Sequence, residues 1–238
     1  MWFIQYLETT RSPFYSFFFT LPLFFIYEVG LLLISSEEMI FMRNGADALM
    51  RQILSTLGIN GFYWIGCIFF LGFLSVYYIQ KEKWQNIRIN SNHLMIMMFE
   101  SLLWAYALFF FMSNIQILLM SPNSSILIQQ VTLAIGAGIY EEILFRVLLI
   151  AGLVSILKFI FDWFKLTHYI VATLLSAAIF SLFHFLGEFG DYFSFNIFMV
   201  RFLAGIFLGI LYFLRGFGIT AWAHAIYDLI IITKITTK

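Results

Sequence analysis

Two adjacent glutamates and an arginine stand inside a strongly apolar stretch, residues 136–146, which reads GAGIYEEILFR. A carboxylate there could act as a general base on a water molecule, or it could ligate a metal ion. On a helix, Glu142 and Arg146 are four residues apart and can form an ion pair, whereas Glu141 has no local partner. Glu141 is therefore the carboxylate left for chemistry. The alternative is that Glu142 and Arg146 form a structural ion pair and that Glu141 has no chemical role.

The cost of placing these charges in a membrane indicates that the stretch needs polar partners. Three charges near the centre of a membrane helix cost roughly 7–10 kcal/mol. The twelve Leu, Ile, Val and Phe side chains between Val131 and Leu153 return only roughly 4–7 kcal/mol. We therefore expect the charges to face a bundle interior or a wet cavity, which is typical of a functional site.

Two histidines and an aspartate interrupt other apolar stretches. His184 ends the segment FSLFH, and His224 and Asp228 are four residues apart, so that they share one face of a helix. A single histidine on an apolar face is more often a core residue than a ligand. Together with Glu141, however, these residues offer two carboxylates and two imidazoles from three helices. This combination suits water activation or metal ligation.

The composition places these residues in a membrane. Of the 238 residues, 62% are hydrophobic and 11% are charged, against about 25% charged residues in soluble domains. We expect an all-α fold, a polytopic transmembrane helix bundle of about 7–8 spans that forms one domain over residues 1–238, with its motif-bearing core at about 126–233. The apolar runs predict spans at about 12–35, 61–80, 93–120, 126–161, 169–186, 195–214 and 219–233.

The polar segments between the apolar runs add three further expectations. Residues 36–60 are predicted to form a helix along the membrane interface, although an eighth span could lie there instead. The lysine and arginine distribution favours an N-terminus on the inner side. Residues 1–11 lack a basic region, so we interpret the first apolar run as a retained helix and not as a signal peptide.

Charge and cysteine content exclude several classes of function. The net charge is zero and the chain has no basic run, so we expect no nucleic acid partner. The single cysteine, Cys67, excludes a disulfide framework and a multi-thiolate metal site.

The predicted spans separate two of the candidate residues. His184 would lie near the outer end of its helix and His224 near the inner end of its own. At about 1.5 Å per residue they would be on the order of 15 Å apart along the membrane normal. They can meet only if a helix tilts, bends or re-enters the membrane, so at least one predicted boundary must be wrong.

Three short motifs together resemble those of one protein family. Residues 141–146 match EExxxR, residues 180–184 match FxxxH, and residues 224–228 match HxxxN/D. In order and approximate spacing they are similar to the CPBP family. That family includes the type II CAAX prenyl endopeptidases, many bacterial intramembrane proteases and bacteriocin-immunity proteins. The resemblance covers about residues 134–228.

The resemblance implies an intramembrane endopeptidase that hydrolyses a peptide bond of a membrane-embedded or lipidated protein. Glu141 would be the general base on a water molecule, assisted by His184. His224 and Asp228 would stabilise the oxyanion of the tetrahedral intermediate. The protein would be a multi-pass integral membrane protein, which we expect in a bacterial cytoplasmic membrane.

The resemblance also gives roles to Glu142, Arg146 and Asp228. Glu142 and Arg146 would shape the site. Asp228 stands where the prenyl endopeptidases usually have asparagine, and an ionised aspartate cannot donate a hydrogen bond to an oxyanion. Asp228 would have to be protonated, orient His224, or ligate a metal.

Zinc is the cofactor that the candidate residues suit. Two histidines and two carboxylates form a reasonable zinc set, with water in the open position. A divalent ion would also offset the buried negative charge. With zinc bound, a chelator should abolish activity and added zinc should restore it. The candidate ligands are Glu141, His184, His224 and Asp228.

Two non-enzymatic functions stay open as alternatives. The chain could be a catalytically silent bacteriocin-immunity or scaffold protein. Alternatively, Glu28, Glu100 and Arg201 could form an ion or proton pathway with the site carboxylates, as in a transporter. The chain shows no repeated halves, which many transporters have. The signatures of other intramembrane proteases, HExxH, a GxS serine and GxGD, are absent from the sequence.

Overall fold

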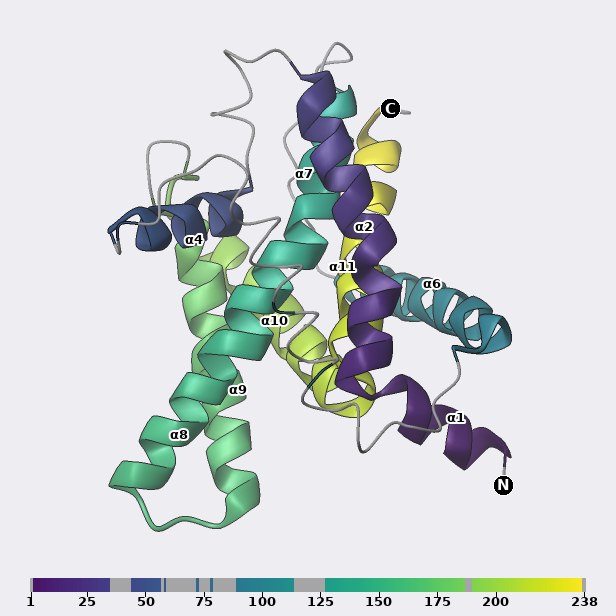
Figure 1. Cartoon of the computed structure of the whole chain (residues 1–238). Helices are drawn as coiled ribbons and strands as arrows, with labels where there is room; N and C mark the ends of the chain where they lie inside the picture. The colour runs from purple at the N-terminus through teal and green to yellow at the C-terminus, as the bar shows by residue number, and fades with distance from the viewer. Residues whose placement is uncertain are drawn as a thin grey trace.

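The computed structural model describes residues 2–34, 44–56, 89–113, 127–186 and 190–236, together with Gly58, Gly72 and Tyr78. Within these residues the chain is helical apart from short connections, and no strand is present. Figure 1 shows long helices that pack into a bundle. The predicted all-α class is therefore confirmed.

The bounds of the helices follow the predicted apolar runs closely. They are α1 (Trp2–Thr10), α2 (Pro13–Leu33), α4 (Gly45–Thr56), α6 (Ser91–Ser113), α7 (Leu127–Gly136), the π-helix η3 (Ala137–Leu149), α8 (Ile150–Ile160), α9 (Lys165–Phe183), α10 (Phe195–Arg215) and α11 (Phe217–Thr236). Helices α7, η3 and α8 follow one another without a break.

Five segments are long and apolar enough to cross a membrane. They are Pro13–Leu33, Ser91–Ser113, Ile128–Ile160, Lys165–Phe183 and Phe195–Arg215, and α11 contains a shorter apolar helix, Phe217–Thr233. Large side chains on these segments face outward, as Phe110 does with 72% of its surface exposed. Such apolar surface fits contact with lipid, so the chain is a helical membrane bundle. The predicted span at about 61–80, which contains Cys67, lies outside the described residues except for Gly72 and Tyr78.

The fifth predicted span lies a few residues too far along the chain. Helix α9 begins at Lys165 and ends at Phe183, instead of running from about 169 to 186. Residues 161–164 form the turn after α8, and Phe164 has the extended backbone that precedes a helix. The hairpin of α8 and α9 extends past the end of the bundle at which α11 begins (Figure 1). His184, at the C-terminal end of α9, therefore lies near the level of the first turns of α11.

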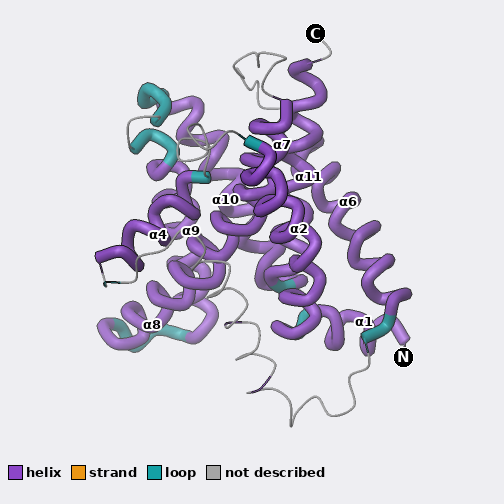
Figure 2. The backbone as a smooth tube through the Cα atoms, turned by 45° about the horizontal axis from the view of Figure 1, so that its top comes forward, coloured by secondary structure: helices purple, strands orange, loops and turns teal. Residues whose placement is uncertain are grey.

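Helix α11 lies at the centre of the bundle and contacts α2, α6, η3 and α10. Helix α6 packs along α11 on the side away from α9 (Figure 2). Gly138 permits the close approach of η3 and α11, because a Cβ atom there would lie 2.5 Å from the carbonyl oxygen of Ala221. Gly136 makes the same kind of approach to the ring of Tyr27. A glycine at each of these two positions thus permits close packing that a larger residue would prevent.

Helix α4 runs crosswise to the long helices and contacts η3 (Figure 1). Its first turn is buried, with Ala46 and Asp47 fully enclosed, whereas Ile53 near its other end is 48% exposed. A helix was predicted within residues 36–60, and its placement along the membrane interface stays a prediction. The buried first turn brings α4 to the polar residues of η3.

Candidate active site

The glutamate pair lies on a π-helix and not on an α-helix. Helix η3 spans Ala137–Leu149, and the wider turn of a π-helix forms bonds from each residue to the fifth residue before it. Glu141, Glu142 and Arg146 are all buried within it. The apolar spacing did not predict this geometry, which is rare and is frequently found at functional sites.

Glu142 is held by two cationic groups. Its Oε2 lies 3.1 Å from Nε of Arg146, which is the predicted ion pair. Its Oε1 accepts a hydrogen bond from Nδ1 of His224 at 2.7 Å. Both carboxylate oxygens are thereby engaged, and Glu142 links η3 to α11.

The second nitrogen of His224 faces Asp228. The distance from Nε2 to Oδ2 of Asp228 is 3.6 Å, which is too long for a hydrogen bond. Asp228 has 29% of its side chain exposed, so it lies at a wetter position than Glu142. Nδ1 carries the proton that is donated to Glu142. When the ring is doubly protonated, Nε2 carries the second proton and can donate it to another group.

His184 is oriented by the backbone of its own helix. Its Nδ1 lies 2.9 Å from the carbonyl oxygen of Phe180, which can only accept a hydrogen bond. Nδ1 therefore donates, and Nε2 of the neutral ring is an acceptor. The ring is partly exposed at the end of α9.

The ring of Phe180 brings the two histidines and the arginine together. Its centroid lies 4.9 Å from the ring of His184, 6.3 Å from that of His224 and 4.6 Å from Cζ of Arg146. Glu141 is close enough to interact electrostatically with His184 and with His224. Arg146, His184 and His224 thus lie around one phenylalanine, although the predicted spans placed the histidines far apart.

Asn44 is a site residue that the sequence analysis missed. Its Nδ2 donates a hydrogen bond to Oε1 of Glu141 at 2.9 Å, and the asparagine is 7% exposed. The only local signal was its type, since asparagine before a helix is a common N-cap. Nothing near Asn44 in the sequence indicates a contact with a residue 97 positions away.

A polar network fixes α4 beside Asn44. Tyr27 donates a hydrogen bond to Oδ2 of Asp47 at 2.9 Å, and Oδ1 of Asp47 lies 2.7 Å from Nε of Arg51. Arg51 also lies 3.9 Å from Glu28, which accepts a hydrogen bond from Tyr140 at 3.3 Å. The network joins α2, α4 and η3, so Glu28 takes part in anchoring α4.

Glu100 belongs to a separate cluster that joins α1, α6 and α10. Its carboxylate pairs with Nε of Arg215 and accepts from Nη2 at 2.9 Å and from the hydroxyl of Tyr6 at 2.8 Å. Burial and the hydrogen bond to Glu100 raise the pKa of Tyr6 above its usual range, so its hydroxyl stays a donor. Arg201 pairs with Asp191 at 2.6 Å. Each of these charges has a local partner of opposite sign.

The described residues do not form a zinc site. No three His, Cys, Asp or Glu side chains within the described ranges are arranged to hold a metal ion. Nδ1 of His224 is engaged by Glu142, and Glu141 is engaged by Asn44. The zinc prediction is therefore left as a prediction, and no step proposed below passes through a metal.

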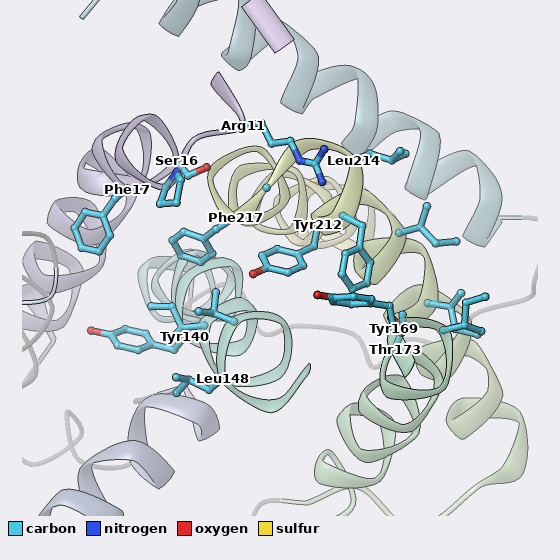
Figure 3. A pocket seen from close by; sticks show the side chains of 18 of the residues that line it. Arg11, Ser16, Phe17, Tyr140, Leu148, Tyr169, Thr173, Tyr212, Leu214 and Phe217 are labelled. Carbon is cyan, nitrogen blue, oxygen red and sulfur yellow. The ribbon is translucent and has the colours of Figure 1, made fainter. Parts of the chain in front are cut away.

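A large apolar cavity lies beside η3 but does not contain the polar site. Its volume is about 1230 Å³, and none of the four candidate residues lines it. Arg11 and Lys165 also line it. Figure 3 shows how side chains of α2, η3, α9 and α10 surround the space. Its lining includes Phe17, Tyr140, Ile143, Tyr169, Tyr212 and Phe217.

One family model matches the part of the chain that contains the three motifs. Residues 123–230 match the family model described as type II CAAX prenyl endopeptidase Rce1-like. Comparisons with curated proteins and with solved structures gave no significant match. The matched range contains the three motifs and excludes Asn44. Residues 123–230 are therefore similar to the Rce1-like type II CAAX prenyl endopeptidases, and at the level of that family the similarity supports an intramembrane protease.

Proposed function

We propose that the protein hydrolyses a peptide bond of a membrane-embedded or lipidated protein, with Glu141 as the general base on a water molecule. One observation carries this proposal. Glu141 is a buried carboxylate that Asn44 holds by one oxygen, while two imidazoles lie within electrostatic reach. Such an arrangement suits proton transfer to and from a bound water. We place the reaction in a bacterial cytoplasmic membrane.

In the first step, Glu141 accepts a proton from the water as the water oxygen attacks the carbonyl carbon of the scissile bond. His184 assists through Nε2, which accepts a hydrogen bond from the same water because Nδ1 is occupied by the carbonyl of Phe180. The carbonyl oxygen of the substrate becomes an oxyanion.

His224 stabilises that oxyanion. Glu142 holds Nδ1–H, and the nearby Asp228 balances the positive charge of a doubly protonated ring, so that Nε2–H donates to the oxyanion. Asp228 then acts through His224 and does not itself donate. In the last step the intermediate collapses, the C–N bond breaks, and the protonated Glu141 gives its proton to the leaving amine.

The apolar cavity fits an apolar portion of the substrate better than the scissile bond. Tyr140 lines the cavity and is adjacent in sequence to Glu141, which does not line it. The reacting bond would therefore lie outside the cavity, next to Glu141.

The test is a comparison of membrane proteomes from cells that carry wild-type protein or the Glu141→Gln variant. We expect an uncleaved precursor to accumulate in the variant while the abundance of the protein itself stays unchanged. Glu8→Gln is the matched control, because Glu8 is exposed on α1. Identical proteomes for wild type and Glu141→Gln would overturn the proposal.

The scaffold and transporter alternatives predict other experimental results. Intact biological function of Glu141→Gln would favour a scaffold or immunity protein. Ion flux in proteoliposomes that depends on Glu28 or Glu100 would favour a transporter. The ion pairs of Glu28 with Arg51 and of Glu100 with Arg215 support a structural role for both residues.

A further inference from the structure

We infer that Asn44 is a positioning residue for Glu141, supplied by α4 from outside the part of the chain that matches the protease family. This inference rests on the proposed function, because it concerns how the general base is held. Asn44 is buried, and its contact with Glu141 connects the segment before α4 to the centre of η3.

The orientation of the Asn44 amide is fixed by its own helix. Oδ1 accepts a hydrogen bond from the backbone N–H of Ala46 at 2.9 Å, as expected of an N-cap. With the oxygen used in this way, the amide nitrogen is the end that faces Glu141. A reversed amide would lose the cap and would direct its oxygen at a carboxylate. Only one orientation therefore satisfies both contacts.

The hydrogen bond from Asn44 gives the two carboxylate oxygens of Glu141 different roles. Nδ2 of Asn44 holds Oε1 of Glu141, which leaves Oε2 to accept a proton from water. Glu141 also feels the positive charge of Arg146, which already pairs with Glu142. Without Asn44, the carboxylate is free to rotate toward that arginine and away from the water. A hydrogen bond to a fixed donor prevents this rotation.

Other contacts keep the N-terminus of α4 in place. The backbone N–H of Asn44 lies 3.4 Å from the hydroxyl of Tyr27, which also donates to Asp47. Gly45 packs against Phe183, and a Cβ atom there would lie 3.3 Å from its ring. The donor is thus presented from a rigid position between α2, η3 and α9, as positioning of a catalytic group requires.

The test uses substitutions that keep the cap and remove the donor. Asn44→Ser retains a good N-cap, but its hydroxyl is too short to reach Glu141. Asn44→Asp also retains the cap and places a second carboxylate against the first. Gln52→Ser is the matched control, because it removes an exposed amide from the same helix. Cleavage is measured in proteoliposomes on the precursor that accumulates with Glu141→Gln.

We expect Asn44→Ser to lower kcat by about 10–100-fold with KM changed less than about twofold, as is typical when a partner of an active-site group is removed. We expect Asn44→Asp to lower kcat further. Gln52→Ser should keep the wild-type rate, and the thermal stability of Asn44→Ser should match that of the control. A wild-type kcat for Asn44→Ser would overturn the inference, and so would a loss of kcat that merely follows a loss of folded protein. If Glu141→Gln itself remains active, the proposed function fails instead.

Discussion

At the scale of single residues, two neighbouring glutamates have different surroundings. Glu142 has both oxygens bound, to Arg146 and His224, whereas Glu141 has one oxygen bound to Asn44. A carboxylate with a free oxygen can take a proton, and one that is fully paired serves better to hold an imidazole. The geometry therefore favours Glu141 as the base and Glu142 as the support of His224.

Asp228 is the residue whose role is most sharply tested by substitution. We expect Asp228→Asn to keep activity within about tenfold of wild type, because an asparagine amide can donate directly to the oxyanion. Asp228→Ala should lose about 100–1000-fold in kcat, since neither a donor nor a balancing charge remains. The measurement is kcat for precursor cleavage in proteoliposomes. Equal loss in both variants would show that the negative charge itself is required.

The sequence predicted some contacts of the candidate site and not others. The Glu142–Arg146 pair could be predicted because its members are one helical turn apart. Asn44 could not be predicted, because its contact with Glu141 depends on the position of α4 in the folded bundle. The nearness of His184 to His224 likewise depends on tertiary packing, which places Phe180 between them.

At the scale of helices, the π-helix and the glycines within and beside it determine how the site is built. Glu141 and Glu142 lie at the middle of η3, and Gly138 lets α11 approach closely enough for His224 to reach Glu142. The π-helix could not be predicted, because apolar spacing in a nearly continuous apolar run hardly separates one helix type from another.

The close approach at Gly138 gives a prediction about stability. Gly138→Ala should lower the free energy of unfolding by about 1–3 kcal/mol, because its Cβ would lie 2.5 Å from a backbone oxygen of Ala221 and the helices would have to separate. Gly152→Ala is the control, since a Cβ there meets no atom within 4 Å. Thermal unfolding in detergent distinguishes the two variants. Equal stability of both would mean that η3 and α11 are not in close contact.

At the scale of the whole molecule, two clusters of charged residues within the described ranges lie in different parts of the bundle. One surrounds Glu141 at the junction of η3, α4, α9 and α11. The other, around Glu100 and Arg215, joins α1 and α6 to the end of α10. The membrane bundle and the positions of most spans were readable from hydropathy. The division of the charges into the cluster around Glu141 and the cluster around Glu100 was not, because it depends on which helices become neighbours.

The second cluster should contribute to stability and not to the chemical step. We expect Glu100→Gln to lower the free energy of unfolding by about 1–3 kcal/mol, because Arg215 loses its buried partner. The kcat per folded molecule should stay at the wild-type value. Thermal unfolding and precursor cleavage, measured on one purified sample, check both statements. A large loss of kcat without loss of stability would place Glu100 in the reaction.

The most direct measurement is precursor cleavage by purified protein in proteoliposomes, with wild type, Glu141→Gln and the exposed control Glu8→Gln compared at equal folded amounts. If Glu141 is the base on the attacking water, wild type and Glu8→Gln cleave at the same rate, and Glu141→Gln shows a loss of at least about 100-fold. Cleavage by Glu141→Gln at the wild-type rate would contradict the role of Glu141 as the catalytic base.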